Sequence, residues 1–430
     1  MSMAVGLLKP NSVFVNHNFM RLFSGKIISQ LGDQIYAFSL SWYILDITKS
    51  SLAMSIFLVI GFLISAVVSP FGGIIADRFD RKKILVWMDV IRGTIVTIAA
   101  LLMYLQMMQI WMLYGSQIVL ALCGAIFSPT ASAIIPNVVE ENQLTQASSM
   151  DLFVGNFCSI IGMVIGSILY ALIGVTAIFL LNAISYFVSG FLEALIHIPL
   201  GKQTGSVRKK SSLYQELGGA VKSLYEGYQY VKSNKLIYNL ILVYAIYFFI
   251  GYPLGMIYVP YTFNVILKAI PLQLSLALGA NFLGSGIGSF IVPQFLHRYK
   301  LKSSIFWGIM IFGFGYLIVA SIIFTPLKGS FDNWDITILW AIISIIIGIG
   351  MISFNIPINV IFQKYTLDEY RGRLWGLQSS IIAFTIGMGY LVGGILAQNV
   401  PMGFLFVGSS LALFAIDLWA VNIKEIKEFT

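Results

Sequence analysis

Long apolar segments separated by short polar stretches fill almost the whole chain and leave little room for a water-soluble domain. A transmembrane helix needs about 20 mostly apolar residues to cross a hydrocarbon core about 30 Å thick. We predict spans near residues 19–45, 52–76, 84–106, 111–136, 146–172, 175–198, 236–263, 275–297, 303–325, 336–363, 371–397 and 402–422. The chain is therefore expected to be an all-α membrane protein with about twelve transmembrane helices.

The composition supports a lipid environment. Of the 430 residues, 58% are hydrophobic and 10% are charged, whereas a soluble domain usually carries about 25% charged residues. The two cysteines, Cys123 and Cys158, both lie in apolar segments, so we interpret them as small core residues. We expect neither a disulfide framework nor a metal site.

Basic residues are distributed in the way that orients membrane proteins. If both termini are cytoplasmic, only Lys49, Lys268 and Lys328 of the loop cations lie outside. The cytoplasmic set is then the whole central linker (201–235) with Arg208, Lys209 and Lys210, together with Arg78, Arg81, Lys82, Lys83, Arg298, Lys300, Lys302, Lys364, Arg371, Arg373, Lys424 and Lys427. We therefore predict cytoplasmic termini, and we interpret the net charge of +8 as a topology signal and not as a nucleic-acid surface.

The chain divides into two related halves. Residues 1–200 are predicted to form an N-terminal six-helix bundle and residues 236–430 a C-terminal one, and segment 127–149 resembles 354–380 when Pro129 is aligned with Pro357. Duplicated halves are common in transporters. The intervening residues 201–235 form a cytoplasmic linker in which apolar side chains recur at helical spacing. This pattern indicates an amphipathic interfacial helix or, alternatively, a solvated linker helix.

The loop after the second span reads GGIIADRFDRKK (72–83). It resembles the loop signature of the major facilitator superfamily, with Asp80 where the family has a second glycine. Together with GDQIYAFSLSWYILDITKSS (32–51) and YRGRLWGL (370–377), it most resembles the macrolide-efflux and enterobactin-exporter branch. The resemblance covers essentially the whole chain. It implies the facilitator fold, with two six-helix pseudo-repeats in the plasma membrane of a bacterium.

The same loop is predicted to act as a conformational latch. The Asp77 carboxylate can accept hydrogen bonds from arginines and lie against a helix end across the interface between the halves. These contacts would form in one state of the transporter and break in another. The alternative is that the basic residues only set topology. The predicted latch residues are Gly73, Asp77, Arg78, Arg81 and Lys82.

Ionisable residues inside spans each cost about 2.5–3.5 kcal/mol at a helix centre, so each needs an explanation. Asp89 and Arg92 are three residues apart and can neutralise each other. Glu193 lies near a cytoplasmic end, four residues before His197, and Asp417 is expected to reach interfacial water.

Asp33 is the exception, because it lies near the middle of the first span with Lys26 about two turns away. It shares a helix face with Gln30, Tyr36 and Ala37, so this polar stripe is expected to face a cavity. A carboxylate removed from water binds a proton more readily, which is the property needed to exchange protons for a substrate. Asp33 is therefore predicted to couple protons or bind substrate, unless it is a structural aspartate bonded to a neighbouring helix.

The resemblance implies that the first, fourth, seventh and tenth helices line a central path. The seventh span is broken at Pro253 and Gly255, which indicates either a gating point or a packing kink. Two features common in the superfamily are missing: an arginine in the fourth helix and a Gly-Pro motif in the fifth. The predicted lining, suited to a bulky and largely apolar substrate, is Gln34, Tyr36, Gln117, Tyr244, Tyr247, Asn355 and Asn359.

An enzyme or a primary pump finds no support, because the histidines are scattered and no nucleotide-binding phosphate loop is present. We predict a gradient-driven exporter of macrolide-like or other amphipathic compounds. The expected coupling ion is H+, and the chain is expected to be a monomer without a cofactor, a catalytic residue or a nucleic-acid partner. A siderophore exporter and a lysophospholipid flippase on the same fold are the alternatives, followed by a non-transporting sensor.

Overall fold

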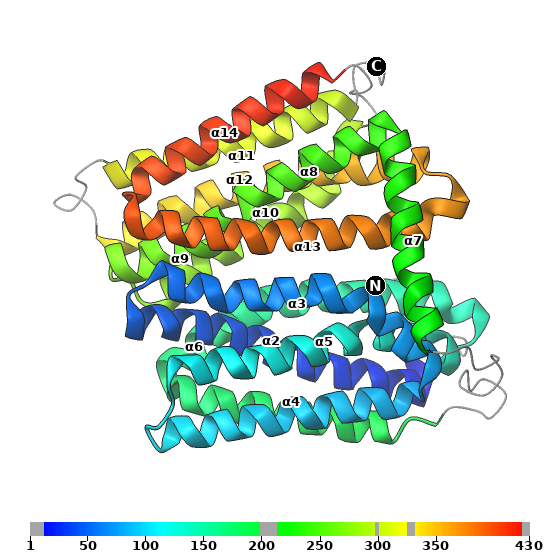
Figure 1. The fold of residues 1–430 in the computed structure, drawn as a ribbon. Coiled ribbons are helices and arrows are strands. Elements are labelled where there is room, and N and C mark those ends of the chain that lie inside the picture. The colour runs from blue at the N-terminus through cyan, green and yellow to red at the C-terminus, as the bar shows by residue number, and fades with distance from the viewer. Residues whose placement is uncertain (1–12, 198–212, 297–300, 325–331, 424–430) are drawn as a thin grey trace. The chain divides into compact units, whose positions relative to one another are not determined.

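The computed structural model describes residues 13–197, 213–296, 301–324 and 332–423, and all regular elements in these ranges are helices (Figure 1). Several residues named above for topology therefore lie outside the described residues, as does the first part of the predicted linker. They are Arg208, Lys209, Lys210, Arg298, Lys300, Lys328, Lys424 and Lys427.

The helices follow the predicted apolar segments closely. After a short helix η1 (Val13–Val15), the first part of the chain forms α2 (His17–Thr48), α3 (Ser51–Arg78), α4 (Arg81–Tyr104), α5 (Ile110–Val138), η2 (Glu141–Gln143) and α6 (Leu144–Ala194). The second part forms α7 (Leu213–Ser233), α8 (Lys235–Pro253), η4 (Leu254–Tyr258), α9 (Val259–Tyr261), η5 (Thr262–Ile266), α10 (Pro271–Leu296), α11 (Leu301–Phe324), α12 (Asn333–Tyr365), α13 (Asp368–Asn399) and α14 (Met402–Asn422).

Ten helical segments of the described residues are long and apolar enough to cross a membrane. Helix α2, which contains Asp33, is not among the ten, and α6 holds two predicted spans joined at Gly174. Gly174 has φ of +73°, a conformation that glycine adopts at no steric cost. The all-α multi-pass membrane fold is confirmed, and the count of twelve spans stays a prediction.

The chain forms two compact units. Unit one comprises Met1–Leu40 and Ile64–Ala220, and unit two comprises Ser41–Leu63 and Val221–Thr430. Within unit one, α4 packs on both α5 and α6. Within unit two, α12 packs on α10 and α11, α11 on α14, and α8 on α13 (Figure 1).

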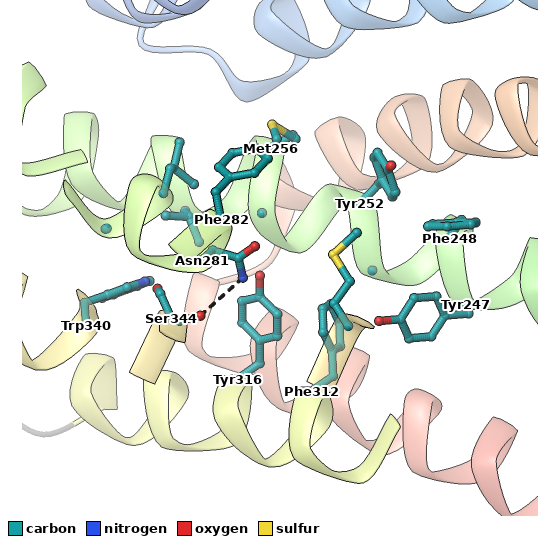
Figure 2. A pocket seen from close by; sticks show the side chains of 16 residues that line it. Tyr247, Phe248, Tyr252, Met256, Asn281, Phe282, Phe312, Tyr316, Trp340 and Ser344 are labelled. Carbon is teal, nitrogen blue, oxygen red and sulfur yellow. Dashed lines mark hydrogen bonds between the residues drawn. The ribbon is translucent and has the colours of Figure 1, made fainter. Parts of the chain in front are cut away.

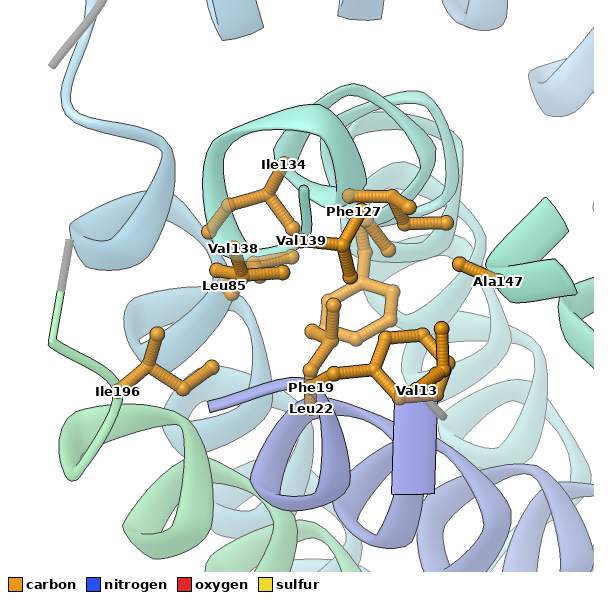
Figure 3. Packing of buried hydrophobic residues seen from close by; sticks show 12 residues of the cluster. Val13, Phe19, Leu22, Leu85, Phe127, Ile134, Val138, Val139, Ala147 and Ile196 are labelled. Atoms are coloured by element: carbon orange, nitrogen blue, oxygen red, sulfur yellow. The ribbon is translucent and has the colours of Figure 1, made fainter. Parts of the chain in front are cut away.

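A hydrophobic cluster in unit one fixes the beginning of α2. Phe19 and Leu22 pack among buried residues of α4, α5 and the chain after α6, including Leu85 and Ile134 (Figure 3). The Asn16 side chain accepts hydrogen bonds from the backbone N–H groups of Asn18 and Phe19, and it donates to the Val138 carbonyl at 2.6 Å. These contacts set the register of α2 and therefore the position of Asp33.

Glycines allow the helices of unit two to approach closely. A Cβ atom on Gly284 of α10 would overlap the backbone of Ile345 in α12, and one on Gly348 of α12 would overlap the backbone of Asn281 in α10. In α13, Gly389 and Gly393 pack against Phe249 and Pro253 of α8. The cysteines Cys123 and Cys158 are buried and free, as expected for small core residues.

The second part of α7 contacts other helices of unit two. The Tyr230 ring stacks on Tyr370 with centroids 4.5 Å apart, and Arg373 forms an ion pair with Glu226 at 3.0 Å. The Tyr230 hydroxyl also accepts a hydrogen bond from the Leu367 backbone N–H at 3.3 Å. This part of α7 is therefore held by contacts with the start of α13. The sequence had indicated an interfacial amphipathic helix or a solvated linker helix, and neither interpretation included these contacts.

Candidate functional site

Asp33 is positioned by the close approach of α2 to α6. A Cβ on Gly25 would lie 3.2 Å from the Ser189 hydroxyl oxygen, and one on Gly32 would overlap side chains of α6. Small residues let helix backbones come together in this way. The approach brings the Tyr186 hydroxyl of α6 to Asp33, where it donates a hydrogen bond to Oδ1.

Arg92 of α4 is shared between two carboxylates. Its Nη1 atom lies 3.7 Å from Asp33 Oδ2, and its Nη2 atom donates a hydrogen bond to Asp89 Oδ1. The guanidinium carbon lies 4.3 Å from the centroid of the Phe127 ring and 4.6 Å from that of Tyr186. The predicted pairing of Asp89 with Arg92 is confirmed, and Arg92 of the third span also lies beside Asp33.

Glu193 of α6 is the third acid of this group. It is fully buried, and both of its carboxyl oxygens have no hydrogen-bond partner among the described residues. It interacts electrostatically with Asp89 and Arg92, and one turn before it a Cβ on Gly190 would lie 3.3 Å from the Asp89 Cβ. We call Asp33, Asp89, Arg92 and Glu193 the Arg92 cluster.

One explanation drawn from the sequence was wrong. Asp417 was expected to reach interfacial water, but it is 0% exposed and neither carboxyl oxygen has a hydrogen-bond partner among the described residues. Glu193 is buried as well, although His197, four residues further on, is exposed. Sequence position gives depth along a helix but not the side that faces the bundle.

The Arg92 cluster has an accessible end and a buried end. The Asp33 side chain is 35% exposed, whereas that of Asp89 is 0% exposed. Three ionised carboxylates around one guanidinium would leave two uncompensated negative charges. Burying an unpaired charge costs several kcal/mol, so the cluster favours states in which carboxyl groups carry protons.

The other predicted polar residues near Asp33 are buried or half-buried. Tyr36 is buried with its ring edge against Phe179, at a centroid distance of 4.8 Å. Gln34 lies against Gly162 of α6, and Gln117 of α5 is half-buried. Lys26, the nearest cation in the sequence of α2, forms an ion pair with Asp151.

The predicted cavity residues of the second half lie on α8 and α12. The Tyr244 hydroxyl donates a hydrogen bond to Asn355 Oδ1 at 2.6 Å. Asn359 Nδ2 donates to the Asn355 backbone carbonyl at 2.9 Å, so hydrogen bonds link three of the four predicted residues. The Tyr247 hydroxyl has no hydrogen-bond partner among the described residues; its ring packs at 4.1 Å on Phe354 and lines a pocket.

The loop between α3 and α4 is organised by Arg81. Its guanidinium donates to Asp77 Oδ1 at 2.8 Å, to the Ala133 carbonyl at 2.7 Å and to Asn137 Oδ1 at 2.8 Å. Asp80, the departure from the family signature, caps α4 by accepting from the Lys83 backbone N–H at 3.2 Å. The cap explains why an aspartate suits this position, and the latch role of the loop stays a prediction.

In the structure Gly72 and Gly73 belong to α3, and the glycine that packs closely there is Gly72, the neighbour of the predicted Gly73. A Cβ on Gly72 would lie 2.5 Å from the Ala125 carbonyl oxygen, whereas one on Gly73 would meet nothing within 4 Å. Lys82 is half-buried, and Arg78 is the last residue of α3.

Arg81→Ala should destabilise the protein by about 2 kcal/mol, because it leaves the Ala133 carbonyl and the Asn137 amide without their charged donor. Lys83→Ala is the matched control, since that exposed side chain should contribute less than about 0.5 kcal/mol. Unfolding of the purified protein in mixed micelles, followed by circular dichroism, measures both. Equal stability of the two variants would show that the Arg81 bonds contribute nothing.

The helical fold, the loop at 72–83 and the intramembrane charges define a membrane transporter, and the family model agrees. The Major Facilitator Superfamily model matches residues 22–366, so the chain belongs to this superfamily. Macrolide efflux protein A of Streptococcus pyogenes is 23% identical over 414 residues, which cover 95% of this chain and 96% of that protein. Macrolide efflux protein A of Enterococcus faecalis is 24% identical over 334 residues, covering 77% of this chain and 96% of that one.

Solved transporters share the fold. A bacterial homologue of the iron transporter ferroportin, in an inward-facing state, superimposes with a TM-score of 0.73 and 15% identity, covering 94% of this chain and 99% of its own. The chain is therefore a facilitator-type transporter that resembles the macrolide-efflux branch, as its loop motifs predicted.

Proposed function

We propose that this protein exports a macrolide-like or other amphipathic compound from a bacterial cell by alternating access, driven by proton entry. Its similarity to two macrolide efflux proteins, over 95% of the chain for one and 77% for the other, supports the substrate class and the direction. In this proposal both termini are cytoplasmic, a single chain is the working unit, and the Gly73–Lys82 loop acts as the latch between states.

The Arg92 cluster carries the proposal of proton coupling. Arg92 lies between Asp33 and Asp89, so a proton bound at Asp33 removes one of its two competing anions. The guanidinium is then free to shift toward the two buried acids, Asp89 and Glu193. Because Asp33 lies at the accessible end, it is the group that takes up and releases the proton. When the charge of Asp33 changes, Arg92 of α4 shifts, and this changes its contact with Tyr186 of α6.

The predicted cavity side chains complete the proposal. Gln34, Tyr36 and Gln117 on the first half, and Tyr244, Asn355 and Asn359 on the second, offer aromatic surface and amides to an amphipathic substrate. Tyr247 is left out of this set, because it lines the pocket of unit two. The Tyr244 hydroxyl donates its hydrogen bond to the Asn355 amide oxygen. A substrate acceptor would compete with that oxygen for the Tyr244 hydroxyl.

Asp33→Asn should lower pH-gradient-driven macrolide uptake into everted vesicles at least tenfold, because the amide cannot exchange the proton. Substrate exchange without a gradient should persist, since the side chain keeps its shape. Asp46→Asn on the same helix is the matched control, because that partly exposed carboxylate lies outside the cluster and pairs with Lys49. Unchanged gradient dependence in Asp33→Asn would exclude this coupling role.

A further inference from the structure

Unit two contains a pocket of about 130 Å³ among α8, η4, α10, α11 and α12 (Figure 2). Its walls are mainly aromatic and apolar, and all of its lining residues belong to unit two. The rings come from four helices, with Tyr247 and Tyr252 on α8, Phe282 on α10, Phe312 and Tyr316 on α11, and Trp340 on α12.

The break in the seventh span forms one wall of this pocket. Gly251 and Gly255 lie one turn apart on either side of Pro253, and both line the pocket without filling it. A Cβ on Gly255 would lie 3.6 Å from the Tyr316 hydroxyl oxygen, and the helix continues from Leu254 to Tyr258 as a wider π-helix. Short π-helical segments are frequent at functional sites. The irregular backbone, together with two glycines that have no side chain, creates the pocket.

Polar groups give the pocket a chemical preference. The Tyr247 hydroxyl points into it (Figure 2), and this residue is 1% exposed with no hydrogen-bond partner for its oxygen among the described residues. A buried hydroxyl without a partner is costly, so a ligand that supplies one gains from the bond. The Asn281 side chain donates to the Ser344 carbonyl at 3.4 Å, which fixes the amide at the opposite side of the pocket.

We propose that this pocket is a binding site for a small single-ring aromatic compound with one polar substituent, of the size of phenol. An engineered cavity of roughly 150 Å³ binds benzene, so a space of about 130 Å³ admits one ring. Edge-to-face contacts with the surrounding rings favour an aromatic ligand, and the Tyr247 hydroxyl bonds to its substituent. A macrolide ring is far too large to enter, so the site is separate from the proposed export substrate and does not depend on proton coupling.

Fluorine NMR on the full chain in lipid nanodiscs, with para-fluorophenol as the probe, tests the site. Gly255→Leu should weaken binding at least tenfold, because the new side chain occupies the pocket. Gly286→Leu is the matched control, since a Cβ there meets nothing within 4 Å and the residue is exposed; its affinity should stay within twofold of the parent protein. Ala277→Leu fills the pocket from α10 and gives a second variant if Gly255→Leu fails to fold.

A second comparison tests the hydroxyl. Tyr247→Phe should bind para-fluorophenol about fivefold more weakly, the effect of one hydrogen bond, while its affinity for fluorobenzene is unchanged. The proposal is overturned if the pocket-filling variants bind para-fluorophenol as the parent does, which would mean that the probe only partitions into lipid. It is also overturned if Tyr247→Phe weakens both probes equally.

Discussion

Arg92→Leu should yield little folded protein and no transport. Arg92 is the cation of the Arg92 cluster, so its loss leaves Asp33, Asp89 and Glu193 without a counter-charge inside the bundle. Removing one partner of a buried ion pair costs about 3–5 kcal/mol, which is a large fraction of the stability of a typical protein. The cation–π contacts with Phe127 and Tyr186 are lost as well.

The yield of monodisperse protein and its thermal unfolding in detergent measure this effect. Adding Asp89→Asn to Arg92→Leu should recover part of the stability, because one of the stranded charges is removed. Arg21→Leu on α2 is the control: that half-buried arginine donates to the Leu195 carbonyl after α6 at 2.6 Å and should contribute about 1 kcal/mol or less. An Arg92→Leu protein as stable as the control would contradict a buried, charged cluster.

Gly348→Leu should prevent α10 and α12 from packing. Its Cβ would overlap the backbone of Asn281, and backbone atoms cannot move aside as a flexible side chain can. Overpacking commonly costs about 1–3 kcal/mol even where side chains can adjust, so we expect a loss of at least about 3 kcal/mol here. Because Asn281 lines the pocket of unit two, the variant should also lose binding of para-fluorophenol.

Gly286→Leu again provides the control, since it adds the same atoms to the exposed side of α10. Resistance to unfolding by sodium dodecyl sulfate should fall for Gly348→Leu and stay near that of the parent protein for Gly286→Leu. If both variants unfold alike, the close α10–α12 approach contributes no stability.

The helices could be predicted from the sequence because a membrane imposes a length and a polarity on each one separately. The prediction of a span near 52–76 corresponds to α3 at Ser51–Arg78, and that near 84–106 corresponds to α4 at Arg81–Tyr104. The loop signature between them identified the superfamily. These inferences do not depend on which helices are neighbours in the fold.

The site was predicted less completely because it depends on which helices are neighbours. Asp89 and Arg92 could be paired from their spacing on α4. The contact between Arg92 and Asp33 could not, because it depends on how α2, α4 and α6 pack together. One signal was available: the interior of the first six predicted spans holds three acids near a single arginine. Counting those charges together would have linked Glu193 to the cluster.

The pocket of unit two was also only partly visible in the sequence. Pro253 and Gly255 marked an irregular helix, and Tyr247 was among the predicted lining residues. The side chains that close the pocket, such as Asn281 and Tyr316, come from two further helices whose apolar patterns resemble those of any buried span. Periodicity shows that such helices are buried but not which side chains share a cavity.

The kink at Gly174 has a practical consequence for determining which side of the membrane each loop faces. A single residue joins two helical stretches of α6, so an epitope tag or a protease site inserted there would have helix directly on both sides. Such an insertion would interrupt the helical stretches whose orientation it is meant to report. The segment Leu105–Gln109, between the end of α4 and the start of α5, is a longer connection with exposed residues and is the better place to attach a reporter.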